Sequence, residues 1–243
     1  MSHKVILGIV AGCLATTSAL AQDAVNGTVK GTFHSFDEAN LYSLEAGADM
    51  AINRNFALGG GAGFYGGDEV DDTGVNLTAR GMYMISPNTA IGLFVAYDSI
   101  GDDDATAFGA EVGYMSRGGS FEAYYGAIDS SDQPSDVDRG YGGFAFEFAV
   151  APNFYLTADS QAQAITDGSS TAVIGTASIG ARYQFAQGPS IFAEFGRLRL
   201  ETDIGSVVTS AEEEFIGIGA DFSFGGKSGP MFSNRAIFHT QGF

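Results

Sequence analysis

Tyr42–Ile52 reads YSLEAGADMAI, and this run decides the fold class because apolar and polar residues alternate along it. Successive side chains of a β-strand point to opposite sides, so the alternation predicts a strand with one apolar and one polar face. The pattern recurs as far as Phe224, interrupted by tight turns and by acidic stretches. Many such strands, with short turns at one end and longer loops at the other, are typical of a sheet closed on itself with lipid outside and a polar lumen inside.

We predict twelve such strands, each near the length of about 9–11 residues that a tilted membrane-crossing strand needs. They are expected near 27–35, 42–52, 56–65, 75–85, 90–97, 107–115, 120–128, 141–150, 154–164, 176–185, 191–200 and 215–224. Glycines weaken the first of them, but without it the count would be odd, whereas bacterial single-chain barrels are even. The predicted fold is all-β, an up-and-down antiparallel transmembrane β-barrel of twelve strands, with ten strands as the main alternative.

The connections between these strands are of two kinds. Short ones at 53–55, 86–89, 116–119, 151–153 and 186–189 are rich in the Asn, Gly and Pro that hairpin turns require. Longer ones, such as Ser130–Gly140 and Thr202–Glu213, carry the acidic clusters, which we interpret as solvated loops. In outer-membrane barrels the short turns face the periplasm, so an even strand number places both termini on that side.

The eleventh predicted strand breaks its own alternation. Ile191–Phe195 places its apolar residues on one face, whereas Leu198 and Leu200 fall on the other. A β-bulge at Gly196 would restore the pattern and would turn Arg197 into the lumen.

The two ends of the chain are interpreted separately from the barrel. Residues 1–21 have a positive start, an apolar stretch and an A-x-A cleavage site ending at Ala21, which together indicate a signal peptide. Alternatively, Val10–Cys13 resembles a lipobox, in which Cys13 would be lipidated. If the ordinary cleavage holds, the only cysteine is removed and no thiol chemistry remains. The barrel then occupies 22–224, and Gly225–Pro230 ends the last strand, which leaves 225–243 as a short periplasmic tail.

Charge and composition exclude several functions. The formal net charge of −18 argues against nucleic acid as a partner, because phosphate backbones require a basic patch. After cleavage the chain keeps two histidines, His34 and His239, and Ser35 would point to the face of its strand opposite His34. No familiar nucleophile, metal or phosphate-binding motif is present. We therefore expect no enzyme, no catalytic residues, no cofactor and no metal site.

The polar phase of the strands predicts the lining of the lumen. Its charged members are Lys30, Glu45, Asp49, Arg80, Glu111, Glu122, Glu147, Asp159, Arg182, Glu194, Arg197 and Asp221. Two interpretations stay open. The charges can pair and fill the interior, which would make a closed structural or adhesive barrel that presents acidic loops. Alternatively, the surplus acids can line a narrow, passive, cation-preferring pore.

The final predicted strand, Phe215–Phe224, reads FIGIGADFSF, with alternating apolar residues and a closing aromatic. It looks like the C-terminal signal that the barrel-assembly machinery reads. The whole mature chain resembles the small porin-like outer-membrane β-barrels of Gram-negative bacteria. This resemblance implies an outer-membrane location among lipids and lipopolysaccharide, and contact with the assembly machinery during biogenesis. Oligomeric state and transported solute are left open. The family usually stops at the closing aromatic, whereas this chain continues to Phe243.

Overall fold

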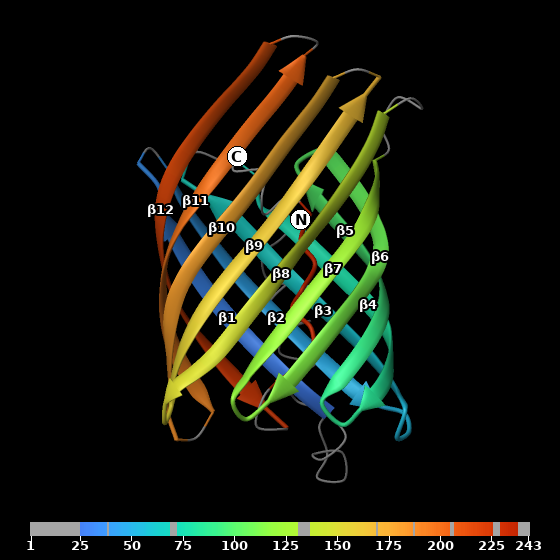
Figure 1. The fold of residues 1–243 in the computed structure, drawn as a ribbon, viewed down its shortest axis with the longest axis vertical. Coiled ribbons are helices and arrows are strands. Elements are labelled where there is room, and N and C mark those ends of the chain that lie inside the picture. The colour runs from blue at the N-terminus through green and yellow to red at the C-terminus, as the bar shows by residue number, and fades with distance from the viewer. Residues whose placement is uncertain are drawn as a thin grey trace.

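Twelve antiparallel strands form one closed barrel in the computed structural model, which describes residues 25–37, 39–68, 72–130, 137–168, 170–186, 188–204, 207–225 and 229–237. The strands are β1 (Val25–Ser35), β2 (Asn40–Ala51), β3 (Phe56–Gly67), β4 (Gly74–Ser86), β5 (Thr89–Ile100), β6 (Asp103–Ser116), β7 (Gly119–Ser130), β8 (Val137–Ala151), β9 (Phe154–Asp167), β10 (Ser170–Gln184), β11 (Pro189–Ile204) and β12 (Val207–Phe224). Each strand pairs with the next along the chain, and β12 returns to pair with β1 (Figure 1). The predicted twelve-stranded up-and-down barrel is confirmed, and the ten-stranded alternative is wrong.

The seam of the barrel runs between β1 and β12, from Gly27 opposite Phe224 to Ser35 opposite Ile216. On its other side β1 pairs with β2 along its whole length, so its glycines do not exclude it from the sheet. A Cβ on Gly27 would overlap the ring of Phe224, so the aromatic ring covers a position that only glycine leaves free. The last strand therefore ends at Phe224, and Phe243 lies outside the described residues.

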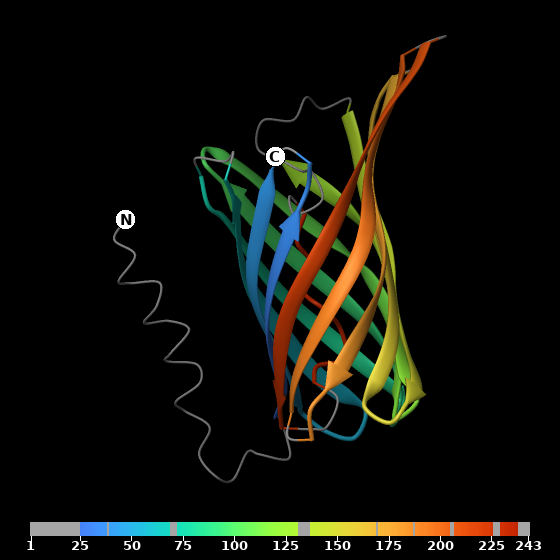
Figure 2. The same cartoon turned by 90° about the vertical axis from the view of Figure 1, so that its left-hand side faces the viewer.

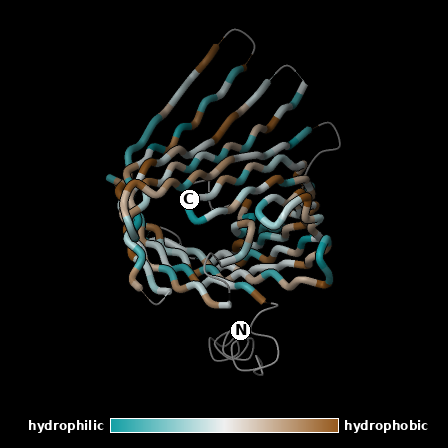
Figure 3. Tube along the Cα trace, turned by 60° about the horizontal axis from the view of Figure 1, so that its bottom comes forward, coloured by the Kyte–Doolittle hydropathy of each residue, from teal (hydrophilic) through white to brown (hydrophobic). Residues whose placement is uncertain are grey.

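The outer wall of the barrel is apolar. Ile91, Leu93 and Val95 of β5 point outward and are 45%, 69% and 47% exposed. A continuous apolar wall is unfavourable in water but suits hydrocarbon, and a closed sheet leaves no backbone edge unpaired against lipid. Figure 3 shows hydrophobic and hydrophilic positions alternating along the strands. Exposed aromatic residues gather near the short turns, as an interfacial girdle requires. They include Phe56, Tyr83, Tyr114, Phe121, Phe148, Phe154, Tyr183 and Phe185.

Connections at the opposite end are shorter than predicted where the strands continue beyond the apolar belt. Residues 205–206 join β11 to β12, in place of the predicted loop Thr202–Glu213. Figure 2 shows these two strands extending past their neighbours. Backbone pairing does not need an apolar face, so hydrophobic alternation stops where the belt ends while the strands go on. Part of the acidic sequence therefore lies on strands and not in loops.

The predicted bulge at Gly196 is absent, because β11 and β12 keep one register through Gly196 opposite Phe215 and Arg197 opposite Glu214. Arg197 consequently lies on the outer face, not in the lumen as expected. Its exposed guanidinium is 2.9 Å from both Glu212 and Glu214. Above the belt the outward face contacts water, so charged residues can replace apolar ones without any change of phase.

The N-terminal predictions concern residues that the structure does not describe. The signal peptide, 1–21, and the alternative lipidation of Cys13 both lie outside the described ranges. Within those ranges, no helix is long and apolar enough to cross a membrane.

Candidate functional site

The described C-terminal residues, Gly229–Ile237, run inside the barrel and are called the plug below. Figure 1 shows them in red between the strand walls. Phe232, Arg235 and Ile237 are only 2%, 2% and 1% exposed. The expected periplasmic tail at 225–243 is therefore wrong for this part, because Gly229–Ile237 lie inside the lumen.

Apolar side chains on the inner wall pack against apolar side chains of the plug. Phe232 packs in one cluster with Ala57, Met82 and Ala90. Ile237 packs in a second cluster, whose members are Tyr65, Phe94, Ala96, Ala105, Ala107, Ile128 and Tyr141. Without the plug these surfaces would face the water of the lumen, so the hydrophobic effect favours its docking.

Alternate backbone N–H groups of the plug donate hydrogen bonds to side chains of the wall. The bonds run from Met231 to Asp49 (2.6 Å), from Ser233 to Glu122 (2.9 Å), from Arg235 to Thr78 (3.2 Å), and from Ile237 to Asp98. This spacing of two is the period of an extended chain. The plug is thus held as a bound peptide by side chains of β2, β4, β5 and β7.

Carbonyl groups of the plug accept hydrogen bonds from two further wall residues. The Arg80 guanidinium donates to the carbonyls of Phe232 at 2.6 Å and Ser233 at 2.7 Å. Asn76 donates to the Arg235 carbonyl at 2.8 Å. In one of the two interpretations left open by the sequence, lumen cations such as Arg80 pair with carboxylates. It does lie 3.6 Å from Glu111, but its closer partners belong to the plug.

Arg235 lies in a pocket built for a guanidinium. Its Nε and Nη2 donate to Glu111 Oε2 at 3.1 and 2.8 Å, and Nη2 also donates to Glu122 Oε2 at 3.0 Å. The guanidinium carbon lies 4.1 Å from the centre of the Tyr124 ring, a cation–π geometry. Buried charges are stable only when they are paired and hydrogen-bonded, so each partner depends on the others.

Glycines of the wall leave the space through which the plug runs. A Cβ on Gly61 would lie 2.5 Å from Oδ1 of Asn234, and one on Gly113 would lie 2.7 Å from the Phe232 ring. The glycine-rich strand β3, interpreted from the sequence as a strand without a phosphate site, thus has a definite role. Its glycines leave room for the plug. The surface of the inner wall of β2–β7 that the plug covers is called the seat below.

Replacing Gly61 by Val is therefore expected to push the plug out of the lumen, because the added side chain would occupy the place of Asn234. The measurement is labelling of Ser233→Cys by a water-soluble maleimide, in a Cys13→Ser background. Labelling should be slow with Gly61 and fast with Gly61→Val. Gly81→Val is the matched control, since a Cβ at that outward position of β4 meets nothing within 4 Å. Equal labelling of the two valine variants would refute this role of Gly61.

A cavity of about 410 Å³ remains between the plug and the walls formed by β1, β2 and β7–β12. Among the described residues its charged lining comprises the carboxylates Glu45, Glu122, Glu147, Asp159, Glu194 and Asp221 and the cations Lys30, Arg182 and Arg235. Acids thus outnumber strong bases by six to three. The lumen is consequently divided into a filled half on the β2–β7 side and an unfilled half on the other.

The basic residues of the unfilled half are tied to the wall. Arg182 lies 2.6 Å from Glu147 and 3.7 Å from Asp221, and its guanidinium is over the ring of Tyr155. Lys30 lies 5.1 Å from the centre of the Phe192 ring. These contacts hold the cations at the wall and leave a surplus of negative charge along the cavity.

The described partner of His34 is a carboxylate. Glu194 accepts a hydrogen bond from Ser178 at 2.7 Å and lies 2.8 Å from His34 Nε2. The carboxylate therefore lies between the imidazole and the hydroxyl, whereas a catalytic relay needs the imidazole in the middle. Among the residues that the structure describes, no group of three or more His, Cys, Asp or Glu could hold a metal ion.

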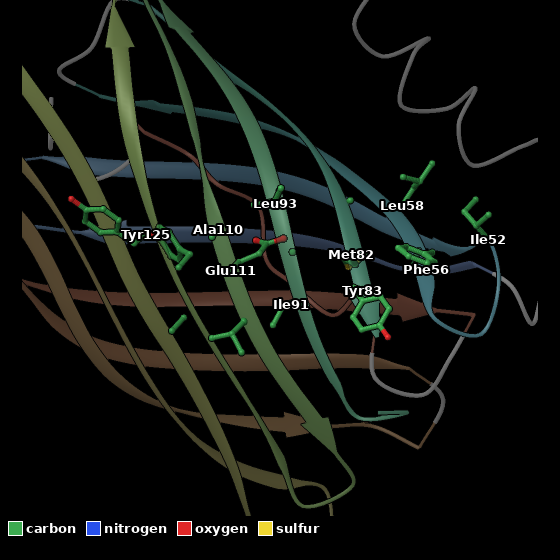
Figure 4. Close-up of a pocket in the computed structure, with 16 residues that line it drawn as sticks. Ile52, Phe56, Leu58, Met82, Tyr83, Ile91, Leu93, Ala110, Glu111 and Tyr125 are labelled. Carbon is green, nitrogen blue, oxygen red and sulfur yellow. The ribbon is translucent and has the colours of Figure 1, made fainter. Parts of the chain in front are cut away.

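A second hollow, of about 960 Å³, lies on the wall of β3–β7. Figure 4 shows Leu58 of β3, Tyr83 of β4, Leu93 of β5 and Tyr125 of β7 around it. Small residues such as Gly81 and Ala110 widen it between these larger side chains. Because its large side chains are those exposed on the outer face, this hollow belongs to the lipid-facing surface and not to the lumen.

Eleven of the predicted lumen residues lie on the inner side of the barrel and separate into two groups. Asp49, Arg80, Glu111 and Glu122 hold the plug. Lys30, Glu45, Glu147, Asp159, Arg182, Glu194 and Asp221 line the cavity. Arg197 alone among those predicted lies outside.

Sequence reasoning missed Asn76, Thr78, Asp98 and Arg235 as members of one site. Asp98 was omitted because the fifth strand was predicted to end at Tyr97, whereas β5 continues to Ile100. One signal was present in the sequence. Phe94 and its inward neighbours on β5 are apolar although they face a lumen expected to be polar, which indicates that another apolar segment covers them.

Together, the closed twelve-stranded sheet, its apolar outer wall and its charged lumen define the fold of the small porin-like outer-membrane barrels. The chain is similar to a solved structure described as the NanC porin, with a TM-score of 0.59 and 8% identity, covering 81% of this chain and 98% of that one. It is also similar to the KdgM porin, with a TM-score of 0.56, 10% identity and coverage of 81% and 99%. A third similar structure is an outer-membrane channel from Pseudomonas putida F1, with a TM-score of 0.56 and 14% identity, covering 86% of this chain and 98% of that one. No family model and no curated protein matches the chain.

Proposed function

We propose that this protein is a passive channel of the bacterial outer membrane that admits small cations through the cavity beside the plug. The observation that carries the proposal is the lining of that cavity, with six carboxylates against three strong bases among the described residues. A surplus of one sign of charge within low-dielectric walls concentrates ions of the opposite sign. The plug narrows the lumen, so the solutes are expected to be small.

The proposed location rests on the outer wall and on the likeness in fold to outer-membrane porins and channels. Lipid would surround the apolar belt, and the extended hairpin of β11 and β12, with its acidic residues, would reach into the lipopolysaccharide layer. Delivery by the barrel-assembly machinery is supported by the alternating C-terminal half of β12, which ends in Phe224. An export signal at 1–21 completes this proposal.

Ion selectivity tests the proposal. The double variant Glu45→Gln/Asp159→Asn removes two of the cavity carboxylates, neither of which holds the plug. We expect the ratio of potassium to chloride permeability to fall by about two- to fivefold, because the negative potential of the cavity is reduced. The measurement is the reversal potential across a planar bilayer under a potassium chloride gradient.

The control for this experiment is Asp102→Asn/Asp103→Asn, which removes the same charge from two exposed positions where β6 begins. It should leave selectivity near that of the unchanged protein. Anion selectivity of the unchanged protein, or an equal loss in both double variants, would contradict a cation-preferring cavity.

A closed structural or adhesive barrel is the second candidate, favoured by the plug that fills one half of the lumen. It predicts no ion flux at all after reconstitution. Any stepwise conductance that disappears when barrel folding is prevented would exclude it. The change in gel mobility on heating reports that folding.

A further inference from the structure

We propose that the inner wall of β2–β7 is a binding site for an extended peptide that carries an arginine, and that the plug occupies this site in cis. The inference goes beyond the proposed channel, because binding at this wall does not require ion flux. It rests on three features of the plug and its seat: backbone recognition, a guanidinium pocket, and space reserved by glycine.

The backbone contacts are those of a ligand and not of a strand. The plug joins no sheet: its described N–H partners are side chains, namely Asp49, Glu122, Thr78 and Asp98. Its carbonyls in turn accept from Arg80 and Asn76. All of these groups belong to the rigid wall, so they would remain in place for any chain of the same extended shape.

The guanidinium pocket provides selectivity for arginine over other side chains. Glu111 and Glu122 accept hydrogen bonds from two nitrogens of Arg235, while the Tyr124 ring covers one face of the guanidinium. A planar fork of donors matches this arrangement, whereas the compact ammonium of lysine does not. Both carboxylates and the aromatic ring come from β6 and β7, not from the plug.

Removal of Arg235 leaves the wall strongly acidic. Asp49, Asp98, Glu111 and Glu122 would then face Arg80 as their basic neighbour in this part of the lumen. Buried carboxylates without a counter-charge are unfavourable, so the empty seat should favour a cationic occupant. The apolar clusters that Phe232 and Ile237 complete add a preference for large apolar residues on either side of the arginine.

Asn234 offers an internal control. Both polar atoms of its amide are buried, and neither has a hydrogen-bond partner among the described groups. The amide therefore contributes little to recognition, although it lies beside Gly61 in the middle of the plug. Its removal should not weaken binding, in contrast with removal of the arginine next to it.

The test uses a chain that ends at Gly225, purified in detergent, and a fluorescein-labelled peptide with the sequence of residues 229–237. Fluorescence anisotropy should show saturable binding to the truncated barrel and little binding to the full chain, whose seat is occupied. A peptide with Arg235→Gln should bind at least about tenfold more weakly, because it loses charge-assisted hydrogen bonds. A peptide with Asn234→Ala should bind as well as the original.

Two barrel variants complete the design. In the truncated barrel, Glu111→Gln/Glu122→Gln should lower the affinity for the original peptide. It should also reduce the difference in affinity between the original and the Arg235→Gln peptide. If the truncated chain does not show the heat-modifiable mobility of a closed barrel, the full-length Arg235→Gln variant replaces it. Its own plug is loosened, so the original peptide should compete for the seat and bind measurably.

Equal binding of the arginine and glutamine peptides would overturn the proposal, and so would equal binding by the full-length and truncated barrels. The outcome is separable from that of the channel proposal, because anisotropy in detergent requires no conductance. A barrel that binds the peptide but passes no ions would refute only the channel. One that conducts selectively but does not distinguish the peptides would refute only the binding site.

Discussion

Ending the chain at Gly225 is expected to raise the single-channel conductance by at least about twofold, because the plug fills one half of a lumen that is already narrow for a twelve-stranded barrel. The truncated chain keeps the whole of β12 and its closing Phe224, so the seam with β1 is preserved. Conductance in planar bilayers at fixed salt measures the effect. Cation preference should increase as well, since removal of Arg235 frees Glu111 and Glu122.

The control for this truncation is a chain that ends at Ile237. It lacks only residues 238–243 and keeps every described contact of the plug. Its conductance should match that of the unchanged protein. If the two truncations conduct equally, the plug does not limit ion flow, and the path lies wholly within the cavity on the other side.

Replacing Arg235 by Leu should release the plug or destabilise the barrel, whichever costs less. The guanidinium is 2% exposed, and its loss leaves Glu111 and Glu122 buried without their partner. Breaking a buried ion pair from one side costs about 3–5 kcal/mol, because the remaining charges are left buried without compensation. Proteolysis of the freed segment, followed by mass spectrometry, would detect release. Urea unfolding of the reconstituted barrel would detect destabilisation.

Arg235→Lys separates charge from shape in this experiment. Lysine keeps the positive charge but loses the planar donor fork and most of the contact with Tyr124, so its behaviour should fall between those of arginine and leucine. The exposed Arg197→Leu serves as the control, because surface ion pairs contribute little to stability. If Arg197→Leu and Arg235→Leu behaved alike, the pocket around Arg235 would not be what holds the plug.

The divided lumen would let one barrel combine a filled half with the proposed conducting path. The sequence left these as competing interpretations, because both follow from an excess of inward carboxylates. In the structure Asp49, Asp98, Glu111 and Glu122 bind the plug. The other cavity carboxylates are Glu45, Glu147, Asp159, Glu194 and Asp221, and Glu122 borders both halves. The filled half matches the first interpretation, and the proposed pore rests on the unfilled half.

Three errors of the sequence analysis, all within the strands, share one cause. The alternation rule was used to find where strands end, to detect a bulge at Gly196, and to place Arg197. In each case the rule failed beyond the lipid belt, where the outward face contacts water and no longer needs to be apolar. The same rule assumes a polar lumen. It therefore could not show that inward apolar residues such as Met82 and Phe94 are covered by another part of the chain.

The amino-acid sequence by itself determined the strands within the belt, their number, and which side chains face inward there, because these follow from a period of two between neighbours along one chain. Only the tertiary structure decided the course of the C-terminal segment and the partners of the lumen carboxylates. Arg235 and Glu111 are 124 positions apart, and no local pattern relates them. They meet because closure of the sheet curves β3–β7 around a space that Phe232, Arg235 and Ile237 fill.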